Sequence, residues 1–306
     1  MVATLLIGGI CLFIYSIDLM SKNLEYLSQE KIKRRLTSAT KSTGRGLFMG
    51  FISTAIIQSS SAVTILTISL INARLLSFEN SIALVLGSNV ATTITSFLVG
   101  INIENVSSVI MLFGVILMFS KKDRVHLAGR LILAIGLLFF SLYIMSLSIL
   151  ELKDSPVFYE YVQRVSDSFL ISLVVGCLLT LVLQSSSLFV AILQVLAMAG
   201  FLSLKNAIPF IFGANIGTTF DSFFGIIHSK KEGKKLIHFH FYFNLLTVIF
   251  FSIFSNSFYK LVLAVISIAS FNIKIQIAIA NILFNILGVI LVLPFLKQVK
   301  RYYARW

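Results

Sequence analysis

The sequence predicts an all-α integral membrane protein built from two halves that repeat each other with inverted topology. The chain has 306 residues, of which 58% are hydrophobic and 12% charged, and its mean hydropathy is +0.97. Soluble domains contain about 25% charged residues, so a soluble fold could not cover its surface with so few. Apolar runs of about 20 residues recur, which is the length that crosses a bilayer as a helix. A polar tetrad, Gln-Ser-Ser-Ser, occurs twice within this apolar chain.

Seven apolar segments are predicted to be transmembrane helices. No alternating strand pattern of the outer-membrane type is present. The first segment has no basic region before it and no small-residue cleavage site after it, so we interpret it as a retained helix and not a signal peptide. The predicted spans are 3–20, 80–100, 106–120, 129–150, 206–227, 236–256 and 275–296.

Two further apolar stretches, 47–71 and 169–200, contain the tetrads near their middles. Four consecutive polar side chains predict that the helix breaks at that point. Each stretch is long enough for two half-crossings of the membrane. We therefore predict two re-entrant helical hairpins, each with a tetrad at its tip.

The distribution of positive charge supports these hairpins. If the first hairpin enters from the cytoplasm and the second from outside, 20 of the 25 Lys and Arg residues lie on the cytoplasmic side, as the positive-inside rule requires. The same topology needs 258–272 to lie along the outer surface. It predicts a multi-pass protein of the plasma (inner) membrane, with a cytoplasmic C-terminus and an external N-terminus. The net charge of +13 then reflects membrane topology and not nucleic-acid binding. The cytoplasmic segments are 21–46, the loop at Arg74, 121–130, 228–235 and 297–306.

An internal repeat relates the two halves, 1–150 and 151–306. Gln58 and Gln184 are 126 residues apart, and so are Asn89 and Asn215. The segments around them align without a gap, and the matches concentrate on polar residues. With the two copies entering from opposite faces, this is the inverted-topology repeat of secondary transporters, whose sites lie near the membrane midplane.

The tips of the predicted hairpins suit the binding of small ions. The amides that begin the returning half-helix have partial positive charge, and the carbonyls that end the entering half-helix have partial negative charge. Serine hydroxyls both donate and accept hydrogen bonds, and their oxygens also suit a hard cation such as sodium. An anion and a small cation can therefore bind side by side.

A second repeated element follows each tetrad, "GSNVATT" from Gly87 and "GANIGTT" from Gly213. A glycine followed by Asn and a Thr pair within an apolar span predicts a helix broken at mid-depth, facing the tips. Asp221 follows the second pair, and an intramembrane carboxylate suggests a sodium ligand or charge-balancing group, against the alternative of a structural acid. The candidate substrate- and sodium-binding residues are Gln58, Ser59, Ser60, Ser61, Asn89, Thr92, Thr93, Gln184, Ser185, Ser186, Ser187, Asn215, Thr218, Thr219 and Asp221.

Polar residues in membrane helices often have only a structural role. Ser and Thr commonly pack between helices or bond to their own helix. The duplication of a whole tetrad at a constant distance from a duplicated Asn-x-x-Thr-Thr favours a binding site instead.

Both tetrads, each followed about 26 residues later by its Asn-x-x-Thr-Thr element, resemble the type II sodium/phosphate cotransporter family, in its short bacterial form. The sequence "HFYFNLL" from His240 is similar to a helix of that family, and the resemblance covers residues 3–296. It implies sodium-coupled symport of inorganic phosphate by alternating access, with the tetrads and Thr pairs forming the site in the bilayer. Ser88 and Ala91 depart from the commoner Ala and Gly of the second copy, and Asn281 stands where many relatives have histidine.

Alternatives stay open for the cargo and the transport mode. Another small oxyanion or a carboxylate could be the substrate, a passive channel could replace the symporter, and several copies could form a homo-oligomer. An intramembrane serine hydrolase would need a base near a serine. None of the four histidines lies in a repeat partner of the tetrads, and no GxSxG sequence is present, so we expect no enzyme and no cofactor, with sodium as the coupling ion. The histidines are His126, His228, His238 and His240.

Overall fold

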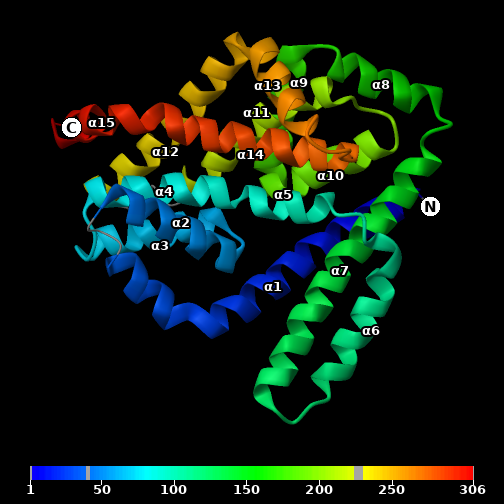
Figure 1. Cartoon of the computed structure of the whole chain (residues 1–306), viewed down its shortest axis with the longest axis horizontal. Helices are drawn as coiled ribbons and strands as arrows, with labels where there is room; N and C mark the ends of the chain where they lie inside the picture. Colours follow the sequence, from blue (N-terminus) through cyan, green and yellow to red (C-terminus); the bar gives the residue numbers. More distant parts are fainter. Residues whose placement is uncertain (1, 39–41, 224–229, 306) are drawn as a thin grey trace.

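The structure, a computed structural model, consists of helices joined by turns and loops in the part of the chain that it describes (Figure 1). The description covers the backbone of residues 2–38, 42–223 and 230–305, and their side chains except those of 25–38 and 221–223. The elements are α1 (Val2–Ser38), α2 (Thr43–Ile57), α3 (Ser60–Asn72), α4 (Phe78–Ala91), α5 (Thr93–Gly100), η2 (Glu104–Val106), α6 (Ser107–Met118), α7 (Asp123–Glu151), α8 (Pro156–Ser166), α9 (Phe169–Leu183), α10 (Ser186–Met198), α11 (Leu204–Phe223), α12 (Lys231–Ile253), α13 (Ser255–Ile266), α14 (Ile273–Val292), η3 (Leu293–Phe295) and α15 (Leu296–Arg305).

The helices fit a membrane protein by length and composition. Within the described residues, five are long and apolar enough to cross a bilayer, or six if α8 and α9, which meet at 103°, form one bent span. The five are Val2–Leu24, Phe78–Gly100, Asp123–Glu151, Lys231–Ile253 and Ile273–Arg305. The prediction of an all-α membrane protein is therefore confirmed.

The predicted span at 106–120 is wrong as a full crossing. Its helix, α6, has 12 residues and is about 18 Å long, whereas the hydrocarbon core is about 30 Å thick. With the first part of α7 it forms a helical hairpin that projects from the rest of the molecule (Figure 1). The span predicted at 206–227 corresponds to α11, whose description ends at Phe223.

Both tetrads break the helix, as the sequence predicts. Gln58 ends α2 and Gln184 ends α9, each with left-handed backbone at φ 57° and 50°. The next serine then caps the following helix, since Ser59 accepts from the amide of Ala62 and Ser185 accepts from the equivalent amide of α10. A serine N-cap stabilises a helix by about 1 kcal/mol. The helices on either side of each break have 13 to 15 residues, too short to cross the membrane singly.

The repeat extends from the sequence to the backbone. The helices α2 and α9 begin and end 126 residues apart, and so do α3 and α10. Equivalent serines, Ser42 and Ser168, cap the first helix of each pair. The turn that follows each second helix has a left-handed residue, Arg74 at φ 60° and Gly200 at φ 90°.

Repeat-equivalent glycines hold each pair of helices in close contact. A Cβ at Gly87 would lie 1.9 Å from the carbonyl oxygen of Leu47, and a Cβ at Gly213 would lie 1.9 Å from that of Leu173. Both pairs of residues are related by the same offset of 126 positions. The backbones of α2 and α4, and of α9 and α11, can approach this closely only because these positions lack a side chain.

Replacing Gly213 with alanine is expected to destabilise the protein strongly. The added methyl group would overlap the α9 backbone, which cannot move as a flexible side chain can, and such overpacking costs typically 1–3 kcal/mol or more. Thermal denaturation in detergent, followed by size-exclusion chromatography, measures this loss. Gly8→Ala is the matched control, because nothing lies within 4 Å of a Cβ at Gly8, and its melting temperature should stay at the wild-type value. Equal melting of both variants would contradict the proposed role of Gly213.

The broken helices predicted at the second repeated element are not observed as such. In the second half, α11 continues through Gly213–Thr219 without interruption. In the first half, a single residue, Thr92, separates α4 from α5, and the two helices still form one span. The physical reason is that the glycines serve helix packing, while the Thr hydroxyls bond to carbonyls of their own helix and so need no break.

The helices α2–α5 form the first repeated unit and α9–α11 the second. Two further helices, α12 and α14, lie between these units and join their cores. Phe243 of α12 packs with α3 and α4, while Phe251 of the same helix packs with α10 and α11. Val289 and Phe284 of α14 divide between the two cores in the same way. The space where the units meet is therefore bounded by α12 and α14.

Candidate functional site

A small polar cavity lies where the two units, α12 and α14 meet. It has room for about one water-sized sphere. Nine of its eleven lining residues are polar, and among the described residues none that lines it is charged. The lining consists of Asn89, Thr92, Thr93, Ser186, Val190, Ala214, Asn215, Thr218, Asn244, Asn281 and Asn285.

Six of the candidate residues predicted from the sequence line this cavity. They come from both halves of the chain, although α4 and α11 belong to different units. The repeat-equivalent pairs Asn89 with Asn215 and Thr92 with Thr218 are both present. The six residues are Asn89, Thr92, Thr93, Ser186, Asn215 and Thr218.

The threonine hydroxyls at the cavity already donate hydrogen bonds to carbonyls of their own helices. Thr92 and Thr218 each donate to the carbonyl four residues earlier, at 3.1 and 2.9 Å, and Thr93 donates to the carbonyl three residues earlier at 2.7 Å. A hydroxyl has one proton and two lone pairs. With the proton used, these oxygens can offer only lone pairs to a guest in the cavity.

A buried network of three side chains fixes Asn89. Its Oδ1 lies 2.9 Å from Nε2 of His240, and its Nδ2 donates to Oδ1 of Asn244 at 3.3 Å. Nδ2 of Asn244 donates in turn to the carbonyl of His240 at 3.0 Å. Because a carboxamide oxygen only accepts, Nε2 of His240 is the donor in its contact with Asn89. The network joins α4 to α12 and orients two asparagines at the cavity.

The α14 wall is formed by two further asparagines. Nδ2 of Asn281 donates to Oγ of Ser96 on α5 at 3.1 Å, and Nδ2 of Asn285 donates to the carbonyl of Asn281 at 3.0 Å. Across the cavity, Nδ2 of Asn215 donates to the carbonyl of Ile211 at 2.8 Å. Each of these carboxamides thus uses at least one of its two N–H donors within the protein.

Sequence reasoning did not place Asn244, Asn281 and Asn285 in the site. An asparagine in an apolar helix is expected to bond to a neighbouring helix, and Asn244 does so with Asn89, whereas Asn285 bonds within its own helix, to Asn281. The signal was present in the repeated frame Phe-Asn-x-Leu, found at Phe243–Leu246 and Phe284–Leu287. That frame gives each of the two joining helices an equivalent asparagine.

The tetrads contact the first Thr-pair segment. Oγ1 of Thr95 donates to Oε1 of Gln58 at 2.8 Å, and Oγ of Ser187 lies 3.5 Å from the carbonyl of Thr92. Ser186, the first residue of α10, lines the cavity. The second tetrad, from one half, therefore lies against the Thr pair of the other half.

The other predicted residues lie outside the cavity lining. Ser59 and Ser185 are helix caps, Gln184 is exposed, and Thr219 bonds to its own helix. Asp221 lies in α11, but its side chain is outside the described part of the chain. Also outside the lining are Ser60, which is buried, and Ser61, which is half-buried.

A buried polar cluster closes one end of the α5–α10–α14 interface. Nε2 of Gln194 donates to the carbonyls of Ser96 and Lys274, at 2.9 and 2.7 Å. The ammonium of Lys274, which is only 1% exposed, pairs with the carboxylate of Glu104. Removing one partner of such a buried pair typically costs 3–5 kcal/mol, so this end of the interface is firmly held.

Comparison with known proteins places the chain among phosphate transporters. A family model described as Na+/Pi-cotransporter matches residues 12–147 and 154–298. YqeW of Bacillus subtilis is 27% identical over 239 residues, which cover 78% of each chain. YjbB of Escherichia coli, named for inorganic phosphate export, is 21% identical over 214 residues, covering 70% of this chain and 39% of YjbB.

The human sodium-dependent phosphate transport protein 2B is also similar, with 38% identity over 98 residues, covering 30% of this chain and 14% of the human protein. No solved structure matches the chain. The matched segments of the family model include both tetrads and both Thr pairs. The chain therefore belongs to the Na+/Pi-cotransporter family, whose members are transporters and not enzymes.

Proposed function

We propose that the protein is a sodium-coupled phosphate symporter that works by alternating access, with the cavity between the two units as its binding site. The observation on which this rests is the uncharged, polar lining contributed by both repeated units. Secondary transporters built from repeats bind their substrates at such an interface.

The lining suits sodium in the conformation described. Hard cations prefer oxygen ligands. The hydroxyls of Thr92, Thr93 and Thr218 keep lone pairs free after donating to their own helices. A cavity with room for about one water-sized sphere can hold a sodium ion but not phosphate together with it.

Phosphate binding therefore requires the two units to separate. The tetrads supply the groups that an anion needs, because Ser186 begins α10 at the cavity and the free amides of a helix N-terminus attract anions. The Ser186 hydroxyl can donate as well, and so can that of Ser187 once the separation breaks its 3.5 Å bond to the carbonyl of Thr92. Opening on one side at a time would give alternating access.

Sodium would provide the positive charge that the lining lacks. Among the described residues, no Lys or Arg lines the cavity, and a charged phosphate near the membrane centre is costly without a counter-charge. Coupling follows, because a phosphate ion binds well only when sodium is present.

We propose further that α2–α3 and α9–α10 are re-entrant hairpins that enter from opposite faces. The shortness of these helices and the positive-inside count support this arrangement. In a chain without Cys11 and Cys177, we expect Arg74→Cys to react with a membrane-impermeant maleimide only from the cytoplasm, and Lys205→Cys only from outside. Right-side-out and inside-out vesicles provide the two measurements. Labelling of both cysteines from one face would exclude the inverted arrangement.

Transport in proteoliposomes tests the function itself. Labelled phosphate should accumulate when the sodium gradient points inward and leave loaded vesicles when it points outward. In a symporter the direction of the sodium gradient sets the direction of the phosphate flux. The similarity to YjbB makes export as relevant as uptake. A phosphate flux that does not depend on the sodium gradient would contradict symport. Competition by arsenate, sulfate or a dicarboxylate shows whether another small anion is preferred.

A further inference from the structure

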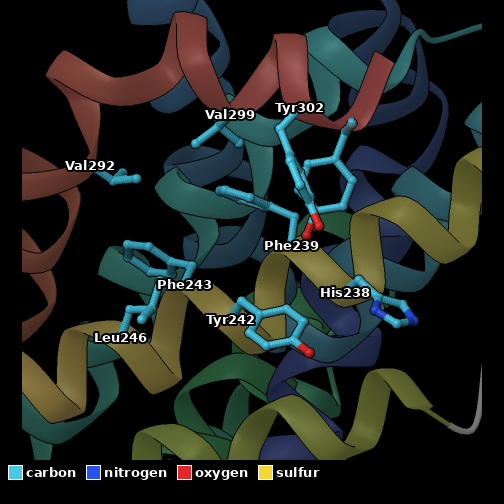
Figure 2. Close-up of a pocket in the computed structure, with 9 residues that line it drawn as sticks. His238, Phe239, Tyr242, Phe243, Leu246, Val292, Val299 and Tyr302 are labelled. Carbon is cyan, nitrogen blue, oxygen red and sulfur yellow. The ribbon is translucent and has the colours of Figure 1, made fainter. Parts of the chain in front are cut away.

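A large groove lies away from the proposed transport site, between α12 and the end of the chain. Its volume is about 560 Å3, well above that of the polar cavity. Figure 2 shows Val299 and Tyr302 projecting from α15 toward Phe239 of α12. The groove is lined by His238, Phe239, Tyr242, Phe243, Leu246, Val292, Val299, Tyr302 and Tyr303.

The floor of the groove is apolar and packed, whereas its rim is exposed. Phe239 and Phe243 belong to the core of the first unit, and Phe239 lies near the ring of Tyr303. At the rim, Leu246 is 62% exposed and Tyr302 is 66% exposed. Exposed apolar side chains face lipid along any membrane-spanning helix, so what distinguishes this place is the groove itself, which is lined by aromatic rings and is large enough for a hydrophobic ligand.

The apolar surface continues from the groove along α12. His238, Tyr242 and Leu246 are four residues apart and share one helix face, and Ile249 and Ile253 beyond them are also exposed. The track from His238 to Ile253 is about 22 Å long. One leaflet of the hydrocarbon core is about 15 Å thick, so the track is long enough to receive a lipid acyl chain.

Positive charge lies at the other end of the groove. The helix α15 is strongly amphipathic, with Leu296 and Tyr303 buried. It has no acidic residue and, within the described residues, none of its cations takes part in an ion pair. Its cations are Lys297, Lys300, Arg301 and Arg305.

Two of these cations line an open surface depression next to the groove. It has a volume of about 440 Å3 and is lined by Gln298, Arg301, Tyr302 and Arg305. Tyr302 lines both the depression and the groove, so the cationic space and the apolar groove share a wall. Arginine forms bidentate hydrogen bonds with phosphate oxygens.

We propose that this composite groove binds an anionic phospholipid from the bilayer. The phosphate of the headgroup lies at Arg301 and Arg305, and one acyl chain lies over Phe239 and Phe243 and along the exposed face of α12. The charge of α15 selects an anionic headgroup over a zwitterionic one, as basic segments at membrane surfaces do. This site is separate from the transport site and does not depend on the proposed function.

Lipid binding to the purified full chain in detergent tests the proposal. Native mass spectrometry or thermal shift would be followed during titration with dioleoylphosphatidylglycerol, dioleoylphosphatidylcholine or inorganic phosphate. We expect saturable binding of phosphatidylglycerol and clearly weaker binding of phosphatidylcholine. Each cation near an anionic surface contributes about a fivefold change in affinity, so the double variant R301Q/R305Q should bind phosphatidylglycerol about 30-fold more weakly.

The matched control is R124Q/R130Q, which removes the same charge from α7 and should leave the affinity unchanged. Tyr302→Ala should weaken binding as well, and because this side chain is exposed its removal leaves folding intact. The proposal is overturned if R301Q/R305Q retains wild-type affinity, if both lipids bind equally, or if inorganic phosphate alone displaces the lipid at equal concentration, which would indicate a simple anion site.

Discussion

Replacing Asn89 with leucine is expected to reduce sodium-driven phosphate transport by about 100-fold or more. The leucine keeps the branched shape but removes both hydrogen bonds that tie Asn89 to His240 and Asn244. Leucine also takes the Asn89 carboxamide away from the cavity wall. A hydrogen bond to a charged group contributes about 1.5–3 kcal/mol, and each 1.4 kcal/mol is a factor of ten, so the loss of a direct contact with the transported ions, together with the disturbed wall, accounts for about two orders of magnitude. Initial rates of labelled phosphate uptake into proteoliposomes, normalised to inserted protein, measure the effect.

Asn206→Leu is the matched control for this experiment. Asn206 also makes side-chain hydrogen bonds, to Ser166 and Asp167, but it lies at the start of α11 and does not line the cavity. It should cost some stability and leave the uptake rate per folded molecule near wild type. Transport by Asn89→Leu at the level of Asn206→Leu, with both variants monodisperse in detergent, would refute the assignment of the cavity as the transport site.

The helix breaks could be predicted from the sequence because they depend on local chemistry. Four polar residues in an apolar segment offer side-chain oxygens that compete for backbone amides, and Ser59 and Ser185 do this as N-caps. Because the two copies are separated by a constant offset, a helix break predicted in one copy was also predicted in the other. The left-handed conformation of both glutamines was not predicted, since it is adopted by non-glycine residues only where the surrounding structure enforces it.

The helix break predicted at the second repeated element was wrong because glycine has two uses in a membrane helix. It can permit a break, or it can permit close approach of another backbone. Gly87 and Gly213 have the second use, and the partner atoms, the carbonyls of Leu47 and Leu173, lie 40 residues earlier in the chain. A single sequence does not tell which segment will pack there, so the choice could not be made in advance.

Part of the cavity lining was predicted from the sequence. The part that was not predicted depends on tertiary packing between helices that are far apart in the sequence. Asn89 and Asn215 were identified through the repeat, whereas Asn244 and Asn285 lie on helices outside the aligned segments. One asparagine in an apolar helix is most simply explained by a bond to a neighbouring helix. Only the meeting of α4, α11, α12 and α14 turns these separate bonds into one lining.

Phosphate affinity is expected to rise with sodium concentration, by about 5- to 150-fold between low and saturating sodium. The reason is electrostatic: the described lining has hydroxyl and carboxamide groups but no fixed cation, so a bound sodium ion supplies the charge that stabilises the anion. Coupling free energies between two sites on one protein are typically 1–3 kcal/mol, which corresponds to this range, and the coupling is reciprocal, so phosphate must tighten sodium binding by the same factor. Calorimetric titration of the detergent-solubilised protein with phosphate, over a series of sodium concentrations with choline holding the ionic strength constant, measures the first factor.

Titration with sodium at several phosphate concentrations measures the second, and the two factors must agree. Choline cannot replace sodium, because a quaternary ammonium is too large for the cavity between Thr92, Thr218 and Ser186 and offers no bare charge to hydroxyl oxygens. Lithium, which is small and hard, is expected to substitute in part. The control is Asn206→Leu, in which the sodium dependence should match that of the wild type. A phosphate affinity that stays flat across the sodium series would eliminate sodium symport and leave a channel or a carrier coupled to another ion, such as the proton, because sodium is the only ion that choline replaces across the series.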